Sequence, residues 1–268
     1  LHYPLRRQRQ MCIRDRLSVD NYPKLDINGK KISKNEQIKH LELIHTKMSD
    51  IQQNIYNITN INKNNSNNNN SNNDDDDNED SGDIQQKVQI SNIVYGKYDK
   101  DIKKVYGNEG LEKVFKIEAK KKGDYKVIYK ENYKDNQILD TSNIGTYSPK
   151  IKLLLENISK SDGIILVYSR YLASGVIPIA IALEHFGFNK LGGNNILKKG
   201  NKDKKKGNYI IISGNTSLSP NTTKEIAVCT NKNNKEGDKV KVILITESGS
   251  EGIDLKNVRE IHIFDPWY

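Results

Sequence analysis

Two polar segments of the chain contain residue types that could bind a phosphate group. Ser250–Asp254 reads SEGID, and its Gly252 lets the backbone approach a ligand closely, so that neighbouring N–H groups can cradle a phosphate. In the same segment, Asp254 supplies an acceptor for a ribose hydroxyl or an arginine. Upstream, Tyr168–Arg170 follows an apolar run, and Ser174–Gly175 opens a predicted helix whose N-terminal amides suit the same anion. These patterns predict a site for a phosphate-containing ligand.

Purely structural interpretations of these residues stay open, since Gly252 could serve only a turn and Ser174 only as a helix N-cap. Motifs that would form a complete catalytic site are absent from the sequence, among them GxxxxGK[ST], GxGxxG and HExxH. Ser250 lies between Gly249 and Glu251, which does not match the nucleophile elbow GxSxG. We therefore expect no self-contained catalytic site and no metal site in this chain.

The elements that must position these segments alternate between strands and helices. Ser148-Pro149 starts a helical pattern that runs to Ile158, and Gly163–Tyr168 is a continuous apolar run typical of a strand buried on both faces. This alternation predicts an α/β fold with a doubly wound parallel sheet, in which ligands bind beyond the carboxyl ends of the strands. The remaining predicted elements are a helix from Ser174 to Gly187, strands at Tyr209–Ile212, Val240–Ile245 and Glu260–Phe264, and a short helix at Asn221–Cys229. Glu184 and His185 are expected on a helix surface rather than as an acid–base pair.

Part of the chain is not expected to fold, because only 35% of its residues are hydrophobic, below the roughly 45–50% of compact domains. Residues 60–83 read NINKNNSNNNNSNNDDDDNEDSGD and are predicted to be a disordered insertion. The net charge of +9 resides in two blocks, residues 1–16 with +4 and residues 198–206 with +5. The charge is therefore no evidence for a basic binding face, and the Lys-rich loop 195–207 is predicted to be solvated rather than DNA-contacting.

The first block of charge has an unusual origin. Met11–Arg16 reads MCIRDR, which resembles the translation of an end sequence used in transposase-based library preparation. We expect residues 1–16 to be a sequencing or assembly artefact, with the natural sequence starting near Leu17. The alternative is a basic N-terminal arm.

Cysteine content and hydropathy bear on the compartment. The two cysteines, Cys12 and Cys229, cannot build a disulfide framework, which is typical of a reducing intracellular compartment. The longest apolar run, Val176–Leu183, is far shorter than the ~18–20 residues that cross a bilayer. We expect a soluble intracellular protein of the nucleus or cytoplasm, a viral factory included, with no membrane contact.

Two of these segments resemble helicase motifs. Gly163–Gly175 reads GIILVYSRYLASG, and Ser250–Tyr268 reads SEGIDLKNVREIHIFDPWY; they look like motifs IV and V of superfamily 2 helicases. The resemblance is strongest to the branch in large DNA viruses, which includes pox-type early transcription factor and nucleoside triphosphatase I ATPases and is similar to SNF2-type translocases. It covers about residues 40–59 and 84–268. Weaker matches precede the two motifs in the expected order, at Lys47–Gln52, Ser91–Tyr95, Tyr106–Leu111 and Tyr147–Ile151.

The resemblance implies a domain organisation. Residues 146–268 are expected to form the C-terminal, second RecA-like domain, cut before motif VI, and residues 84–145 a mostly helical inter-domain linker. Residues 17–59 are expected to be the linker from a first RecA-like domain that this chain lacks. ATP and Mg²⁺ are implied as cofactors, bound mainly by that missing domain.

The resemblance also implies roles for single residues. Glu251, Gly252 and Asp254 of motif V match positions for nucleotide binding and coupling. Positions for nucleic-acid binding are matched by Tyr168, Ser169, Arg170, Ser174, Gly175 and Ser250. DNA or RNA is the implied partner, together with the transcription machinery.

Our leading hypothesis is therefore the C-terminal part of an ATP-dependent helicase or translocase, which by itself cannot hydrolyse ATP. The alternative, from another class, is a degenerate RecA-like module that binds nucleic acid or a partner without ATPase activity. A nucleotide-sugar-dependent transferase with a similar sheet is a third interpretation, on fold alone.

Overall fold

The computed structural model describes residues 42–67, 77–98, 101–119, 121–198, 206–249 and 253–265, and side chains are described outside 60–81. Contacts divide the chain into two units, and Thr46–Asp265 contains all the helices and strands of the described residues. In the other unit only residues 42–45 are described, and they lie in no helix or strand. The expected artefact 1–16 and the first part of the expected linker 17–59 lie outside the described residues.

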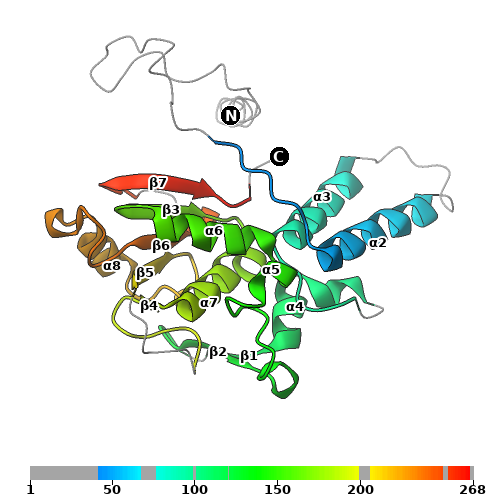
Figure 1. Ribbon diagram of the computed structural model, residues 1–268, viewed down its shortest axis with the longest axis horizontal. Coiled ribbons are helices and arrows are strands. Elements are labelled where there is room, and N and C mark those ends of the chain that lie inside the picture. The colour runs from blue at the N-terminus through cyan, green and yellow to red at the C-terminus, as the bar shows by residue number, and fades with distance from the viewer. Residues whose placement is uncertain are drawn as a thin grey trace, which may run out of the picture. The chain divides into compact units, whose positions relative to one another are not determined.

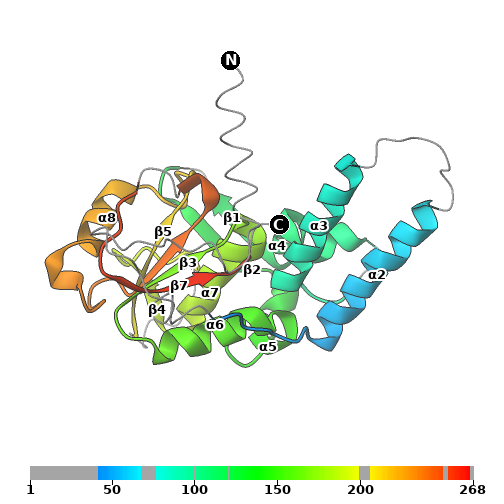
Figure 2. The same cartoon turned by 90° about the horizontal axis from the view of Figure 1, so that it is seen from above.

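The core of the larger unit is a five-stranded sheet in which every pairing is parallel (Figures 1 and 2). Tyr168 at the end of β3 lies opposite Ile245 of β6 and Ile263 of β7, so these strands end at the same edge. This confirms the predicted α/β fold and is consistent with a RecA-like domain. The order is β4 (Phe188–Lys190), β5 (Gly207–Ile212), β6 (Val242–Ile245), β3 (Ile164–Tyr168) and β7 (Val258–Ile263).

Helices cover both faces of the sheet, because successive strand residues point to opposite sides. Ile165 and Val167 pack on the side of α6 (Pro149–Lys160) and α7 (Ile177–Phe186). Ile164 and Leu166, which point to the opposite side, pack with residues of α8 (Thr222–Cys229). Each fully buried isoleucine contributes roughly 1.5–3 kcal/mol to stability relative to exposure. The sheet is thus doubly wound, as predicted.

The start of α7 differs from the prediction. Its expected end holds, since Gly187 caps the helix with φ +108°, a conformation that favours glycine. At the other end the helix begins at Ile177, after a π-helical turn, η4 (Leu172–Val176), in which Ser174 has the non-helical angles φ −107° and ψ 18°. Ser174 is therefore not the N-cap of α7, a position that Val176 occupies. The Ser174 hydroxyl is instead bonded to Gly107 and Gln89.

The region before the sheet contains helices and, in addition, a hairpin that the sequence analysis missed. Its strands β1 (Phe115–Ala119) and β2 (Tyr125–Tyr129) pair antiparallel. Tyr125, Val127 and Tyr129 alternate inward, a period of two that indicates a strand. The helical elements are α2 (Asp50–Asn67), α3 (Asp77–Asn92), η2 (Ile102–Val105), α4 (Gly107–Val114), η3 (Glu131–Tyr133) and α5 (Ile144–Tyr147).

The segment predicted to be disordered, residues 60–83, is helical in part. α2 continues to Asn67 and α3 begins at Asp77, while residues 68–76 lie outside the described residues. The start of α2 and the end of α3 are held together, because Gln52 of α2 donates a 2.9 Å hydrogen bond to the carbonyl of Ile90 of α3. Extending a helix costs less than starting one, so an anchored helix can run into a polar sequence.

The described ends of the predicted Lys-rich loop 195–207 are held by the protein. Leu197 forms a bridge with Val127 of β2, and Ile196 and Leu197 are buried. At the other end, the N–H of Lys206 donates to the carbonyl of Gly187. Residues 199–205 between these anchors lie outside the described residues.

Candidate nucleic-acid interface

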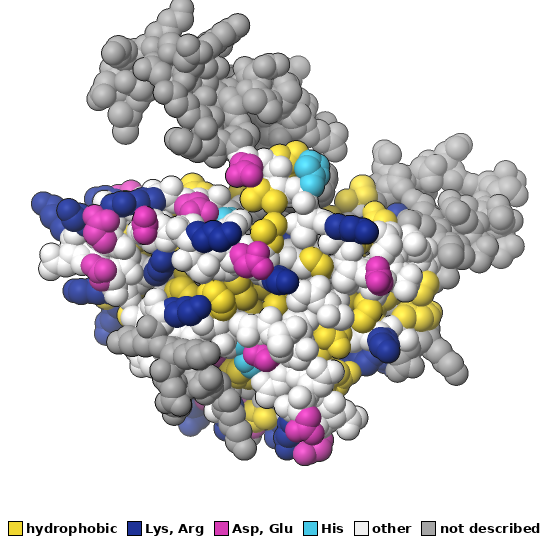
Figure 3. All heavy atoms as spheres, in the orientation of Figure 1, with side chains coloured by type: hydrophobic (Ala, Val, Ile, Leu, Met, Phe, Trp, Pro, Cys, Tyr) yellow, Lys and Arg dark blue, Asp and Glu magenta, His cyan; other side chains and the backbone are white. Residues whose placement is uncertain are grey.

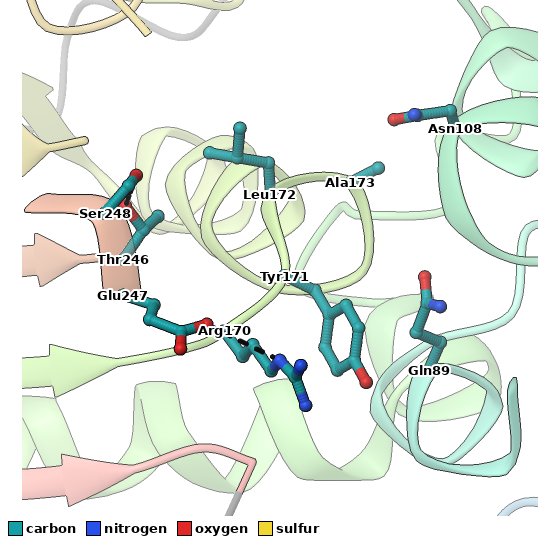
Figure 4. Close-up of a pocket in the computed structure, with 9 residues that line it drawn as sticks. All are labelled: Gln89, Asn108, Arg170, Tyr171, Leu172, Ala173, Thr246, Glu247 and Ser248. Atoms are coloured by element: carbon teal, nitrogen blue, oxygen red, sulfur yellow. Dashed lines mark hydrogen bonds and ion pairs between the residues drawn. The ribbon is translucent and has the colours of Figure 1, made fainter. Parts of the chain in front are cut away.

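A cleft of about 350 Å³ lies at the carboxyl ends of β3 and β6 (Figure 4). The turn after β3 forms part of its lining, and the short helix η6 (Glu247–Gly249) after β6 forms another part. Side chains from α3 and α4 complete it. Ligands of parallel α/β sheets bind at this edge, so the cleft is the candidate site. The lining residues are Gln89, Asn108, Arg170, Tyr171, Leu172, Ala173, Thr246, Glu247 and Ser248.

The predicted segment Tyr168–Arg170 turns into this cleft. Tyr168 is half-buried, and its carbonyl accepts a 2.8 Å hydrogen bond from the N–H of Phe264. Ser169 is fully buried, and its hydroxyl donates to Asp265 Oδ1 at 2.5 Å. Arg170 reaches the cleft, where its Nε lies 3.5 Å from Glu247 Oε2. Arg170 is thus the one predicted residue, among those described, that lines the cleft.

The Asp265 side chain accepts hydrogen bonds from the turn after β3. This carboxylate is 2% exposed, and its Oδ2 accepts a 2.7 Å hydrogen bond from the N–H of Arg170. Burial raises the pKa of Asp265, while the hydrogen bonds from Ser169 and Arg170 and the charge of Lys150 oppose that shift. Asp265 is not among the residues predicted from the sequence to belong to the site.

Lys150 is a half-buried cation near this carboxylate. Its Nζ donates a 2.8 Å hydrogen bond to Asn92 Oδ1 and lies 4.7 Å from the ring centroid of Phe264. Burial lowers the pKa of Lys150 to about 8, and the nearby Asp265 opposes that shift. Opposite charges in one buried cluster therefore offset part of each other's desolvation cost.

Ser174 and Gly175 lie beneath the cleft and not on its surface. The buried hydroxyl of Ser174 accepts a 2.9 Å hydrogen bond from the N–H of Gly107 and donates a 3.2 Å bond to Gln89 Oε1. A Cβ on Gly175 would lie 1.9 Å from Ser169 Oγ, so only glycine fits there. Through its two hydrogen bonds, Ser174 holds the π-helical turn against α3 and α4.

The predicted motif V residues contribute less to the described geometry. Ser250, Glu251 and Gly252 lie outside the described residues. Asp254 is exposed, and its Oδ2 lies 3.5 Å from Lys256 Nζ. It does not line the cleft.

Three lining residues were not predicted from the sequence: Gln89 of α3, Asn108 of α4 and Tyr171 after β3. Asn108 lies within the weak match at Tyr106–Leu111, which was a usable signal. Gln89 carried no signal, because it is 85 residues from the Ser174 that it contacts. Tyr171 lies within the segment Gly163–Gly175 that resembles motif IV, so of the three residues it carried the strongest sequence signal.

The electrostatics of the visible surface are mixed. On the face shown in Figure 3, Lys and Arg side chains are interspersed with Asp and Glu. Among the described residues, no three His, Cys, Asp or Glu side chains gather as metal ligands do. No helix in the described part of the chain has the length and apolar content to span a membrane.

The parallel doubly wound sheet and the polar cleft at its carboxyl edge define an α/β domain with RecA-like features. Comparison with known proteins points to the same class. The chain is 28% identical over 149 residues to the "Termination factor NPH-I homolog" of African swine fever virus (isolate Pig/Kenya/KEN-50/1950), a match that covers 46% of this chain and 21% of the relative.

Two proteins of Acanthamoeba polyphaga mimivirus, each named "Putative ATP-dependent RNA helicase", are also similar. One is 33% identical over 132 residues, covering 48% of this chain and 21% of its own length. The other is 32% identical over 130 residues, covering 48% and 23%. The matched part thus spans about a fifth of the length of these relatives. No protein-family model matches this chain. The predicted resemblance to superfamily 2 helicases of large DNA viruses is confirmed.

Proposed function

We propose that this chain is the C-terminal part of an ATP-dependent helicase or translocase, which couples ATP hydrolysis to movement on DNA or RNA. The observation that carries the proposal is the turn after β3, which presents Arg170 at a cleft on the carboxyl edge of the sheet. The viral relatives named as helicases support the same function.

In this proposal Arg170 contacts a backbone phosphate of the nucleic acid. A guanidinium matches phosphate geometry with two parallel hydrogen bonds and keeps its charge at every physiological pH. Ser169, Ser174 and Gly175 position the turn, and Tyr168 supports its start. Ser250 adds a nucleic-acid contact, while Glu251, Gly252 and Asp254 serve nucleotide binding and coupling.

ATP and Mg²⁺ belong mainly to a first RecA-like domain in this proposal. The described residues offer Asp254 as an acceptor for a nucleotide hydroxyl, and they form no cluster of three metal ligands. Bound ATP would supply the driving force, and this chain would hold the nucleic acid and couple that contact to the nucleotide through Glu251, Gly252 and Asp254.

Binding of fluorescent DNA and RNA oligonucleotides, followed by anisotropy, tests the role of Arg170. Arg170→Gln should weaken binding by roughly tenfold and flatten its salt dependence, because one phosphate contact is lost. The matched control is Arg259→Gln, since Arg259 also pairs with a glutamate, Glu236, at 2.5 Å, but at the amino end of β7. The control should bind like the unaltered chain. Equal losses from both variants, or none, would contradict the proposal.

ATPase assays on the natural full-length protein separate the enzyme from the alternative binding module. Turnover stimulated by nucleic acid is expected, and Asp254→Ala should lower it without changing thermal unfolding. Asp238→Ala, which alters another exposed acid, is the control. Unaltered turnover in Asp254→Ala would refute its coupling role, and a full-length protein without ATPase activity would favour the binding module.

The transcription machinery is the proposed protein partner, because the African swine fever virus relative is named a termination factor. We place the protein inside the cell, in the nucleus, the cytoplasm or a viral factory. Affinity purification of the full-length protein from its host, probed for RNA polymerase subunits, tests the partner. Recovery of nucleic acid without polymerase would contradict it.

A further inference from the structure

We propose that the cleft binds an unstacked base of the nucleic acid, with Tyr171 as the stacking surface and Gln89 and Asn108 as hydrogen-bonding groups at the edge of the base. This inference deepens the proposed function and rests on it. It assigns a base contact to a site where Arg170 alone would read only the phosphate backbone.

The charge of the cleft is the first argument. Arg170 and Glu247 lie 3.5 Å apart, and the other lining side chains are uncharged. A site for phosphates alone would gather positive charge, because neutralising phosphates dominates that kind of binding. Most of this lining is therefore suited to a neutral group that carries hydrogen-bond donors and acceptors.

The available hydrogen-bonding groups are the second argument. The hydroxyls of Ser169 and Ser174 are bonded within the protein. By contrast, the Asn108 amide, the Tyr171 hydroxyl and the Gln89 Nε2 group have no hydrogen-bond partner among the described residues. Asn108 is also exposed. The groups left for a ligand are thus two amides and a phenol.

The arrangement of these side chains is the third argument. Figure 4 shows the Tyr171 ring between Arg170 and the Gln89 amide, while Leu172 and Ala173 lie above the ring in this view. Base–aromatic stacking is a general mode of single-strand binding, and Asn and Gln amides pair with base edges. The volume of about 350 Å³ lies at the lower end of the roughly 300–1,000 Å³ of ligand pockets.

The linker contributes the base-contacting groups, and its position is fixed. Gln89 lies on α3 and Asn108 on α4, whereas Tyr171 follows β3. The bond from Ser174 to Gln89 Oε1 orients that amide and leaves both hydrogens of Nε2 for a ligand. The hydroxyl of Tyr95, also in the linker, donates to the carbonyl of Ala173. Linker and sheet therefore form one site.

Anisotropy with paired oligonucleotides tests the proposal. One set carries normal bases, and the other carries abasic sugars with the same number of phosphates, each as DNA and as RNA. The unaltered chain should bind the abasic strands roughly tenfold more weakly, within the range for loss of one stacked base. Tyr171→Leu should lose a similar factor on normal strands and nothing further on abasic ones.

Three variants complete the test. Tyr171→Phe keeps the ring and should bind within about twofold of the unaltered chain. Tyr98→Leu, which removes a tyrosine outside the cleft lining, should also leave binding unchanged. Asn108→Ala should alter the ranking of the four homopolymers, because the edge of the base is read by that amide.

Each outcome decides something different. Equal binding of normal and abasic strands by the unaltered chain would overturn the base contact and leave the proposed function in place. Absence of binding to every strand would overturn the proposed function itself. If Tyr171→Leu fails to fold, the comparison of normal with abasic strands on the unaltered chain still gives the answer.

Discussion

The hydroxyl of Ser169 donates a 2.5 Å hydrogen bond to the carboxylate of Asp265, 96 residues farther along the chain. The second oxygen of the same carboxylate accepts the N–H of Arg170 at 2.7 Å. One side chain at the end of β7 therefore fixes the backbone from which Arg170 enters the cleft. Asp265 is a positioning residue, because it acts through Arg170 and lies buried below the cleft.

Asp265→Asn tests this relationship. The amide oxygen can still accept from Ser169, but the amide nitrogen would face the N–H of Arg170, so one bond is replaced by two opposed donors. We expect the free energy of unfolding to fall by about 1–3 kcal/mol and oligonucleotide affinity to fall with it. Urea titration and anisotropy measure the two effects.

The same pair of measurements distinguishes positioning from simple support. Asp238→Asn changes an exposed carboxylate and should alter neither quantity. If Asp265→Asn lowers stability but leaves the affinity unchanged, Asp265 supports the fold and does not position Arg170. A double variant with Arg170→Gln should bind little worse than Arg170→Gln alone, because both changes act on one contact.

Gly175→Ala tests the close approach beneath the cleft. The added Cβ would lie 1.9 Å from Ser169 Oγ and 2.8 Å from Ser169 Cβ, so the turn must shift. We expect a loss of about 1–3 kcal/mol or more in the free energy of unfolding, together with weaker oligonucleotide binding.

The matched control for this substitution is Gly82→Ala in α3, where no atom lies within 4 Å of the new Cβ. There alanine should stabilise the protein by about 0.5–1 kcal/mol, since glycine is unfavourable inside a helix. Thermal unfolding of both variants is the measurement. A stability of Gly175→Ala equal to that of the unaltered chain would mean that the turn adapts at no cost.

Periodicity was sufficient to predict the sheet, and it failed where elements are short or locally ambiguous. The apolar runs at β3, β5 and β6 and the apolar–polar alternation at β7 are long enough to identify. β4 has only three residues, Phe188–Lys190, and follows a helix after a single glycine. In the β1–β2 hairpin the two strands flank the lysine run 120–122 and each contains a lysine, which obscures the period of two.

The site was predictable only for residues inside a recognisable motif. Arg170 directly follows the strand that the pattern identifies, and it lines the cleft; its contact with nucleic acid stays a prediction. Ser174 has the residue type of an N-cap, but its partner is the N–H of Gly107, a contact between distant segments. Gln89 and Asn108 reach the cleft only through packing of the linker, which local pattern does not encode.

Glu184 is the clearest departure from local pattern, because it was predicted on a helix surface and is 1% exposed. Its Oε1 accepts hydrogen bonds from the N–H of Ile196 at 2.7 Å and from the hydroxyl of Tyr209 at 2.6 Å. Its Oε2 accepts the N–H of Leu197 at 2.8 Å. The carboxylate thereby anchors the start of the Lys-rich loop to the core.

Burial raises the pKa of Glu184 from 4.5 to about 7, against the opposing effects of these hydrogen bonds. Between those two pH values the folded state binds more protons than the unfolded state, so the stabilising contribution is complete below pH 4.5 and is lost as the pH rises through 7. Relative to Glu184→Gln, the unaltered chain should lose roughly 3 kcal/mol of unfolding free energy across this range.

Urea titrations of both proteins at several pH values between 4.5 and 7.5 measure that difference. The adjacent His185 has a pKa lowered by burial and acts in the opposite sense, but it is present in both proteins and cancels. Glu184→Gln should also be less stable at low pH, since its amide nitrogen would oppose one backbone donor. Parallel pH profiles for the two proteins would contradict the raised pKa of Glu184 in the folded state.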